Sequence, residues 1–283
     1  MIGIILLFLI CVHLSVGMTI SLVPISQKTL GEKFFRFNGT VSLVFLALGE
    51  IGYQVFGSFD QDAMPSEKVL HWLIRINYAE PWLWSSGLLL LIYILTLPYC
   101  RYPIRRLLLL LSSLCGSVAL VVLALESQSQ AIPQWLGRII FPLDLLLSAL
   151  ALGSVTTCMI LGHWYLVDPG MSVRPLKILA AILISVVSAR AVLGGCTSLL
   201  IWWNLTNSGN DPFSNPDVGN LLFLLQRVLF GLVLPLALSW MIWQTVKIRS
   251  TQSATGILYV AVVFILFGEL LSHYLLIATG YPI

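Results

Sequence analysis

Eight stretches of this chain are long and apolar enough to cross the hydrocarbon core of a bilayer, which an α-helix of about 20 residues spans. Only 10% of the residues are charged and 58% are hydrophobic, which is more apolar surface than a soluble domain can bury. The sequence therefore predicts one integral membrane domain over residues 1–283. The predicted segments are 2–23, 38–57, 81–99, 104–125, 138–166, 177–203, 218–246 and 255–279.

The fold class predicted from these segments is an all-α bundle of eight transmembrane helices. Backbone polar groups in lipid must be satisfied within a helix or a closed barrel, and the chain lacks the alternating pattern of a transmembrane barrel. The short connections leave no room for a soluble catalytic domain. The first segment has no Lys or Arg before its apolar run and no small-residue cleavage site, so we expect a retained helix rather than a signal peptide.

Basic residues are distributed unevenly between the two sets of loops. Loops after the odd-numbered segments hold ten: Lys28, Lys33, Arg36, Arg101, Arg105, Arg106, Arg174, Lys177, Lys247 and Arg249. The other loops hold Lys68, Arg75 and Arg138. By the positive-inside rule the ten face the cytoplasm, and both termini lie on the extracytoplasmic side. The net charge of +3 is thus explained by the basic cytoplasmic loops and does not indicate nucleic-acid binding.

The outer loops are predicted to carry an amphipathic surface segment. Apolar residues of Val69–Tyr78 fall at helical spacing, which predicts a connector lying flat on the membrane. Trp72, Trp82 and Trp135 are expected at the same surface, where they are available to a docked partner.

Ionisable residues inside the apolar segments are the main functional signal, because such residues are expensive in lipid and usually face a bundle interior or a cavity. Counted from the predicted ends, seven lie in the outer half of the bundle: His13, Glu50, Asp144, Arg190, Arg227, Glu269 and His273. A proton or ion pathway needs polar residues along its whole length, whereas a pocket needs them at one depth. The pattern favours a pocket that opens outward.

Glu269 and His273 are four residues apart and share one face of a helix, so they are candidates for the catalytic acid–base pair of a quinol site. The other five are candidate cofactor-binding residues. A purely structural reading pairs Arg190 with Glu269, and Arg227 with Asp144 or Glu50. Five cysteines are scattered without metal-ligand spacing, so no metal site is predicted.

Haem b is the competing cofactor, because histidines supply its axial ligands. Two axial ligands must face each other at one depth. Residue counting places His13 and His273 about five residues apart in depth, or about 7 Å, which argues against a pair.

Four segments carry a family resemblance: HLSVGMTISLV (13–23), FPLDLLLSALALGSV (141–155), LLQRVLFGLVLPLAL (224–238) and FILFGELLSHYLLIATG (264–280). In order and spacing they resemble the membrane anchor subunit of dimethyl sulfoxide reductase, within the wider polysulfide-reductase-type family. One departure is His273, where the family often has arginine three residues after the leucine of its GEL motif.

The resemblance implies a quinone-interacting anchor subunit in a bacterial cytoplasmic membrane. It implies menaquinone or a related quinone as the cofactor, and a partner with iron–sulfur or multihaem centres docked on the extracytoplasmic face. The catalytic metal centres would then belong to that partner. The rest of the surface of this chain would contact membrane lipid. The alternatives are a haem b electron carrier, a transporter, and a scaffold or assembly subunit. A transporter should show internal symmetry and broken helices, and neither is evident in the sequence.

Overall fold

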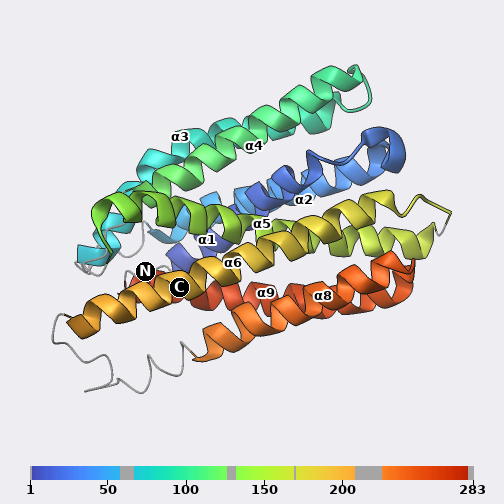
Figure 1. Cartoon of the computed structure of the whole chain (residues 1–283). Helices are drawn as coiled ribbons and strands as arrows, with labels where there is room; N and C mark the ends of the chain where they lie inside the picture. Colours follow the sequence, from blue (N-terminus) through green and yellow to red (C-terminus); the bar gives the residue numbers. More distant parts are fainter. Residues whose placement is uncertain (1, 58–66, 126–131, 169, 208–224, 280–283) are drawn as a thin grey trace.

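The computed structural model describes residues 2–57, 67–125, 132–168, 170–207 and 225–279, which form an all-helical bundle (Figure 1). Eight helices in this part of the chain are long and apolar enough to cross a membrane, which confirms the prediction of a multi-pass helical membrane protein. Residues 218–224, the predicted start of the seventh segment, lie outside the described residues.

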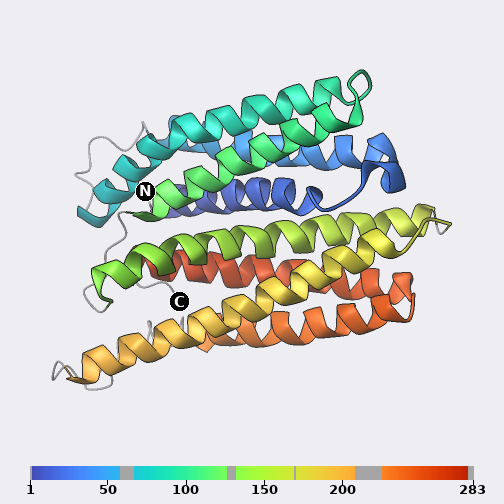
Figure 2. The ribbon, with the colours of Figure 1, turned by 45° about the horizontal axis from the view of Figure 1, so that its top comes forward.

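The elements follow one another up and down along a common direction (Figures 1 and 2). They are α1 (Ile2–Leu22), α2 (Gln27–Gly57), α3 (Glu67–Thr96), α4 (Tyr102–Leu125), α5 (Gln134–Val167), α6 (Arg174–Asn207), the π-helical turn η1 (Leu229–Val233), α8 (Leu234–Lys247) and α9 (Thr251–Thr279). Residues 225–228 are helical and lead into η1. The start of α1 and the end of α9 lie toward the same end of the bundle, opposite the loops that hold the ten basic residues.

Helices α1 and α5 form the centre of the bundle and are the most buried spans. Helix α1 contacts α2, α4, α5 and α9, and α5 contacts α4, α6 and α9 as well. The surrounding helices turn large apolar side chains outward, among them Leu48, Leu88, Leu199 and Val263. Apolar side chains that face outward are what a helix in contact with lipid requires.

The two central helices touch backbone to backbone at Gly17 of α1 and Gly153 of α5. A Cβ atom added to Gly153 would lie 1.9 Å from the carbonyl carbon of Gly17, and one added to Gly17 would lie 1.7 Å from the carbonyl oxygen of Ala149. Small residues at such crossings let transmembrane helices approach closely and gain van der Waals contact. This crossing fixes α1 against α5 about one turn away from His13 and Ser148.

The predicted surface segment Val69–Tyr78 is instead the first part of α3, which continues through Pro81 to Thr96. Pro81 removes only one backbone hydrogen bond, and transmembrane helices tolerate such a loss. Trp72 and Ile76 are buried, at 4% and 0% exposed, and belong to the same core cluster as Phe8 of α1. The amphipathic pattern therefore reflects packing inside the bundle, where α3 contacts α4 and α2, and Trp72 is not available to a docked partner.

A π-helical turn interrupts the seventh segment just before Pro235. Proline has no N–H to donate to the carbonyl four residues earlier, and the N–H of Leu234 bonds the carbonyl of Leu229, five residues back. Gly231 in this turn lets α9 approach, because a Cβ on Gly268 would lie 2.4 Å from the Cα of Gly231. Such turns occur often at functional sites, and this one adjoins the buried Arg227.

Candidate functional site

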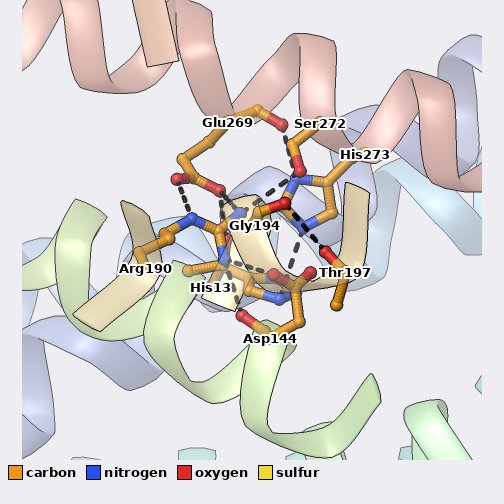
Figure 3. A network of polar contacts seen from close by, with 9 residues as sticks. His13, Asp144, Arg190, Gly194, Thr197, Glu269, Ser272 and His273 are labelled. Atoms are coloured by element: carbon orange, nitrogen blue, oxygen red, sulfur yellow. Dashed lines mark hydrogen bonds and ion pairs between the residues drawn. The ribbon is translucent and has the colours of Figure 1, made fainter. Parts of the chain in front are cut away.

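Arg190 of α6 is the centre of a buried polar network (Figure 3). Its Nε and Nη2 donate to the two carboxylate oxygens of Glu269 in α9, and the Nε–Oε1 distance is 2.6 Å. Its Nη1 donates to both the side-chain Oδ1 and the backbone oxygen of Asp144 in α5, each at 2.8 Å. The second Nη2 hydrogen is directed to Ser272 Oγ at 3.2 Å. All five N–H groups of the guanidinium thus have acceptors, which makes Arg190 a positioning residue.

Glu269 is held from two sides, because Ser148 Oγ of α5 also donates to its Oε2 at 2.6 Å. The network therefore ties α5, α6 and α9 together through residues that are each 6% exposed or less. Sequence reasoning did not single out Ser148 and Ser272. Their spacing could have indicated them. Ser148 lies four residues after Asp144 and Ser272 lies three after Glu269, so each serine shares a helix face with a predicted site residue.

Two histidine rings meet beside this ion cluster. The Nε2 atoms of His13 (α1) and His273 (α9) are 3.4 Å apart, and the rings are nearly perpendicular with centroids 4.5 Å apart. The expectation that the two differ by about 7 Å in depth is wrong. Counting residues from segment ends assumes that all helices end at one level, and α1 and α9 do not.

The tautomers of the two histidines follow from their second nitrogens. His13 Nδ1 lies 2.6 Å from the carbonyl oxygen of Leu9, and His273 Nδ1 lies 2.6 Å from that of Glu269. A carbonyl only accepts, so each Nδ1 carries a proton and donates it. In the neutral rings each Nε2 then carries a lone pair, and the two Nε2 atoms face each other at 3.4 Å between α1 and α9.

Arg227 belongs to the same electrostatic cluster. It is 1% exposed, and the charges of Arg190, Glu269 and Asp144 all act on it. Its guanidinium lies over Gly231, where an added Cβ would be 1.8 Å from Nη1. The two arginines and two carboxylates balance in formal charge, which is what burial of four charges requires. Asp144, which the structural reading paired with Arg227, forms an ion pair with Arg190.

Glu50 of α2 lies apart from this network. It is 5% exposed, and both of its carboxylate oxygens are buried without a hydrogen-bond partner among the described residues. The carboxylate of Glu80 of α3 interacts electrostatically with Glu50. Six of the seven predicted site residues are therefore brought together, and Glu50 occupies a second buried position.

The remaining titratable groups form no comparable cluster in the described part of the chain. His163 of α5 contacts Tyr259 Oη at 3.0 Å toward the opposite end of the bundle. Within the residues that the structure places, no group of three or more His, Cys, Asp or Glu residues is arranged to hold a metal ion.

Comparison with known proteins gives no relative. The chain matches no protein-family model, no curated protein and no solved structure. Its function must therefore be argued from the site itself.

Proposed function

We propose that this protein is the quinone-interacting subunit of a larger membrane oxidoreductase, and that it binds a quinol headgroup next to the His13–His273 pair. The observation that carries the proposal is the facing of two acceptor Nε2 atoms inside the bundle, beside a fixed ion cluster. Quinol oxidation releases two protons and two electrons, so a site for it needs proton acceptors in a water-poor region.

The two imidazoles are the proton acceptors in this proposal. Each has its Nδ1–H fixed by a backbone carbonyl, which orients the ring and makes the Nε2 lone pair the place where a proton can be taken up. Glu269 is less suited to take a proton, because its carboxylate is paired with Arg190 and accepts from Ser148. Its role is to provide a negative charge beside His273 and so stabilise the imidazolium that proton uptake forms.

The ion cluster positions this charge. Arg190 locks the Glu269 side chain between α5 and α6 with a bidentate pair, and the backbone oxygen of Glu269 orients His273. Electrons would leave to iron–sulfur or haem centres of a partner protein on the same side. Of the three tryptophans predicted to meet such a partner, Trp82 and Trp135 are exposed, at 42% and 69%. The membrane would be a bacterial cytoplasmic membrane, with both termini outside.

Haem b is the second candidate, and the contact between two histidines on different helices favours it. The Nδ1–H to carbonyl bonds are those expected of metal-bound histidines. The spacing fits less well. The Nε2 atoms are 3.4 Å apart, which is close enough for direct contact and leaves no space for an iron between them. We therefore favour the quinol.

Gentle detergent extraction of the full chain tests the proposal. The expected result is a bound quinone in the lipid extract, redox proteins that copurify, and no Soret band that belongs to this chain. A Soret band lost in both His13→Gln and His273→Gln would instead establish the haem b carrier. A preparation with neither quinone nor haem would contradict both.

The catalytic prediction concerns Glu269. We expect Glu269→Gln to abolish quinol-dependent reduction of the copurified partner, because glutamine keeps the size and a hydrogen-bonding oxygen but removes the charge beside His273. The variant should be less stable than wild type, since Arg190 loses a charged partner, but still folded at the assay temperature. The readouts are the initial rate of partner reduction and the thermal unfolding of the purified variant. Full activity in folded Glu269→Gln protein would remove the proposed role.

A further inference from the structure

Glu50 is a buried carboxyl group that the network does not use. It lies on α2, and only 5% of its surface is exposed. Leu46 and Leu83, which are 4% and 0% exposed, belong to the core cluster in this region. The adjacent Gly49 packs against Cys11 and Phe8 of α1. An ionised carboxylate in such surroundings requires a cation or several hydrogen-bond donors.

The described residues supply Glu50 with neither. Both carboxylate oxygens lack a hydrogen-bond partner. The charged group that acts on Glu50 is the carboxylate of Glu80, which is of the same sign. Helix α1 contributes no charged residue apart from the titratable His13, whose ring faces His273. On α2 itself, Tyr53 is the nearby titratable group, and both acids act on it.

Glu80 lies closer to the surface than Glu50. It is only partly buried and accepts a hydrogen bond from Gln54 Nε2 at 2.8 Å. Tyr53 Oη, next to both acids, donates to Asn77 Oδ1 at 3.4 Å. Polar side chains of α2 and α3 therefore extend from the buried Glu50 toward the end of the bundle where α3 begins.

We propose that Glu50 and Glu80 form a proton-binding site separate from the histidine network. Glu50 is held there as a neutral carboxylic acid, and its proton exchanges with the aqueous phase through Glu80. Burial of a neutral acid avoids the desolvation cost that an unpaired carboxylate would carry. The ligand is a proton, and the site binds it whether or not a quinone is present.

Covalent labelling tests the protonation state of Glu50 directly. Dicyclohexylcarbodiimide is an apolar reagent that modifies protonated carboxyl groups, so peptide mass spectrometry of the labelled full chain should find the adduct on Glu50. Glu269 is paired with Arg190 as a carboxylate and serves as the internal control that remains unlabelled. Sodium chloride is added in a parallel sample, because protection of Glu50 by sodium would show a metal-cation site and overturn the proposal.

Infrared spectroscopy covers the case in which the reagent fails to reach the site. The carbonyl band of a protonated carboxyl group should be present in wild type and lost in Glu50→Gln. Since glutamine mimics the neutral acid, Glu50→Gln should unfold at the same temperature as wild type or higher. In heavy water the band should shift more slowly in Glu80→Gln than in wild type. Absence of both the adduct and the band overturns the proposal, as does marked destabilisation by Glu50→Gln. An unchanged exchange rate in Glu80→Gln removes the part assigned to Glu80.

Discussion

Arg190→Leu is expected to destabilise the protein by about 3–5 kcal/mol, the cost typical of leaving a buried charge without its partner. Arg190 makes five hydrogen bonds to three residues, and its loss would leave the carboxylates of Glu269 and Asp144 buried, with Arg227 as the remaining arginine of the cluster. The measurement is the thermal or denaturant-induced unfolding of purified protein in detergent, followed by tryptophan fluorescence.

Arg190→Lys is the matched variant, because it separates charge from geometry. Lysine keeps the positive charge but lacks the planar fork that bonds both Glu269 oxygens and Asp144 at once. We expect an intermediate loss of stability. If Arg190→Leu were as stable as wild type, the ion network would contribute little to the fold, and the positioning role of Arg190 would be lost with it.

Gly153→Ala is the second substitution with a large expected effect. The new methyl group would meet the backbone of Gly17 at 1.9 Å, a contact that only movement of α1 away from α5 relieves. Overpacking of this kind costs about 1–3 kcal/mol, and more where backbone rather than a flexible side chain stands in the way. We expect a lower unfolding temperature and, because His13 lies one turn from the crossing, weaker quinone binding.

Gly256→Ala is the control for this prediction. Gly256 lies on α9, and a Cβ there meets nothing within 4 Å, so alanine should be neutral or slightly stabilising. Equal stability of the Gly153→Ala and Gly256→Ala proteins would contradict the close crossing of α1 and α5.

Much of the fold follows from apolar segment length alone. Segments 104–125 and 138–166 match α4 and α5 closely, since a span of this length leaves few alternatives in lipid. Residues 67–80 were harder to assign. Their polar and charged side chains resemble a surface segment, and whether a helix runs through Pro81 depends on the packing of Trp72 and Ile76 against other helices.

The composition of the site was more predictable than its geometry. Intramembrane charge is rare enough that the amino-acid sequence alone indicates a pair between Arg190 and Glu269. Depth counted along each helix failed for His13 and His273, because helix ends differ in level. The separation of Glu50 from the other six residues depends on which face of α2 meets α3, and one charged residue does not reveal that from sequence.

The central claim is that the His13–His273 pair, fixed beside Glu269 and Arg190, binds a quinol headgroup. Its most direct test is the affinity of the full chain, in lipid nanodiscs, for a short-chain menaquinone analogue, compared between wild type, His273→Gln and the control His163→Gln. We predict saturable binding to wild type and His163→Gln and its loss in folded His273→Gln protein. Binding of equal strength to all three proteins would contradict the claim.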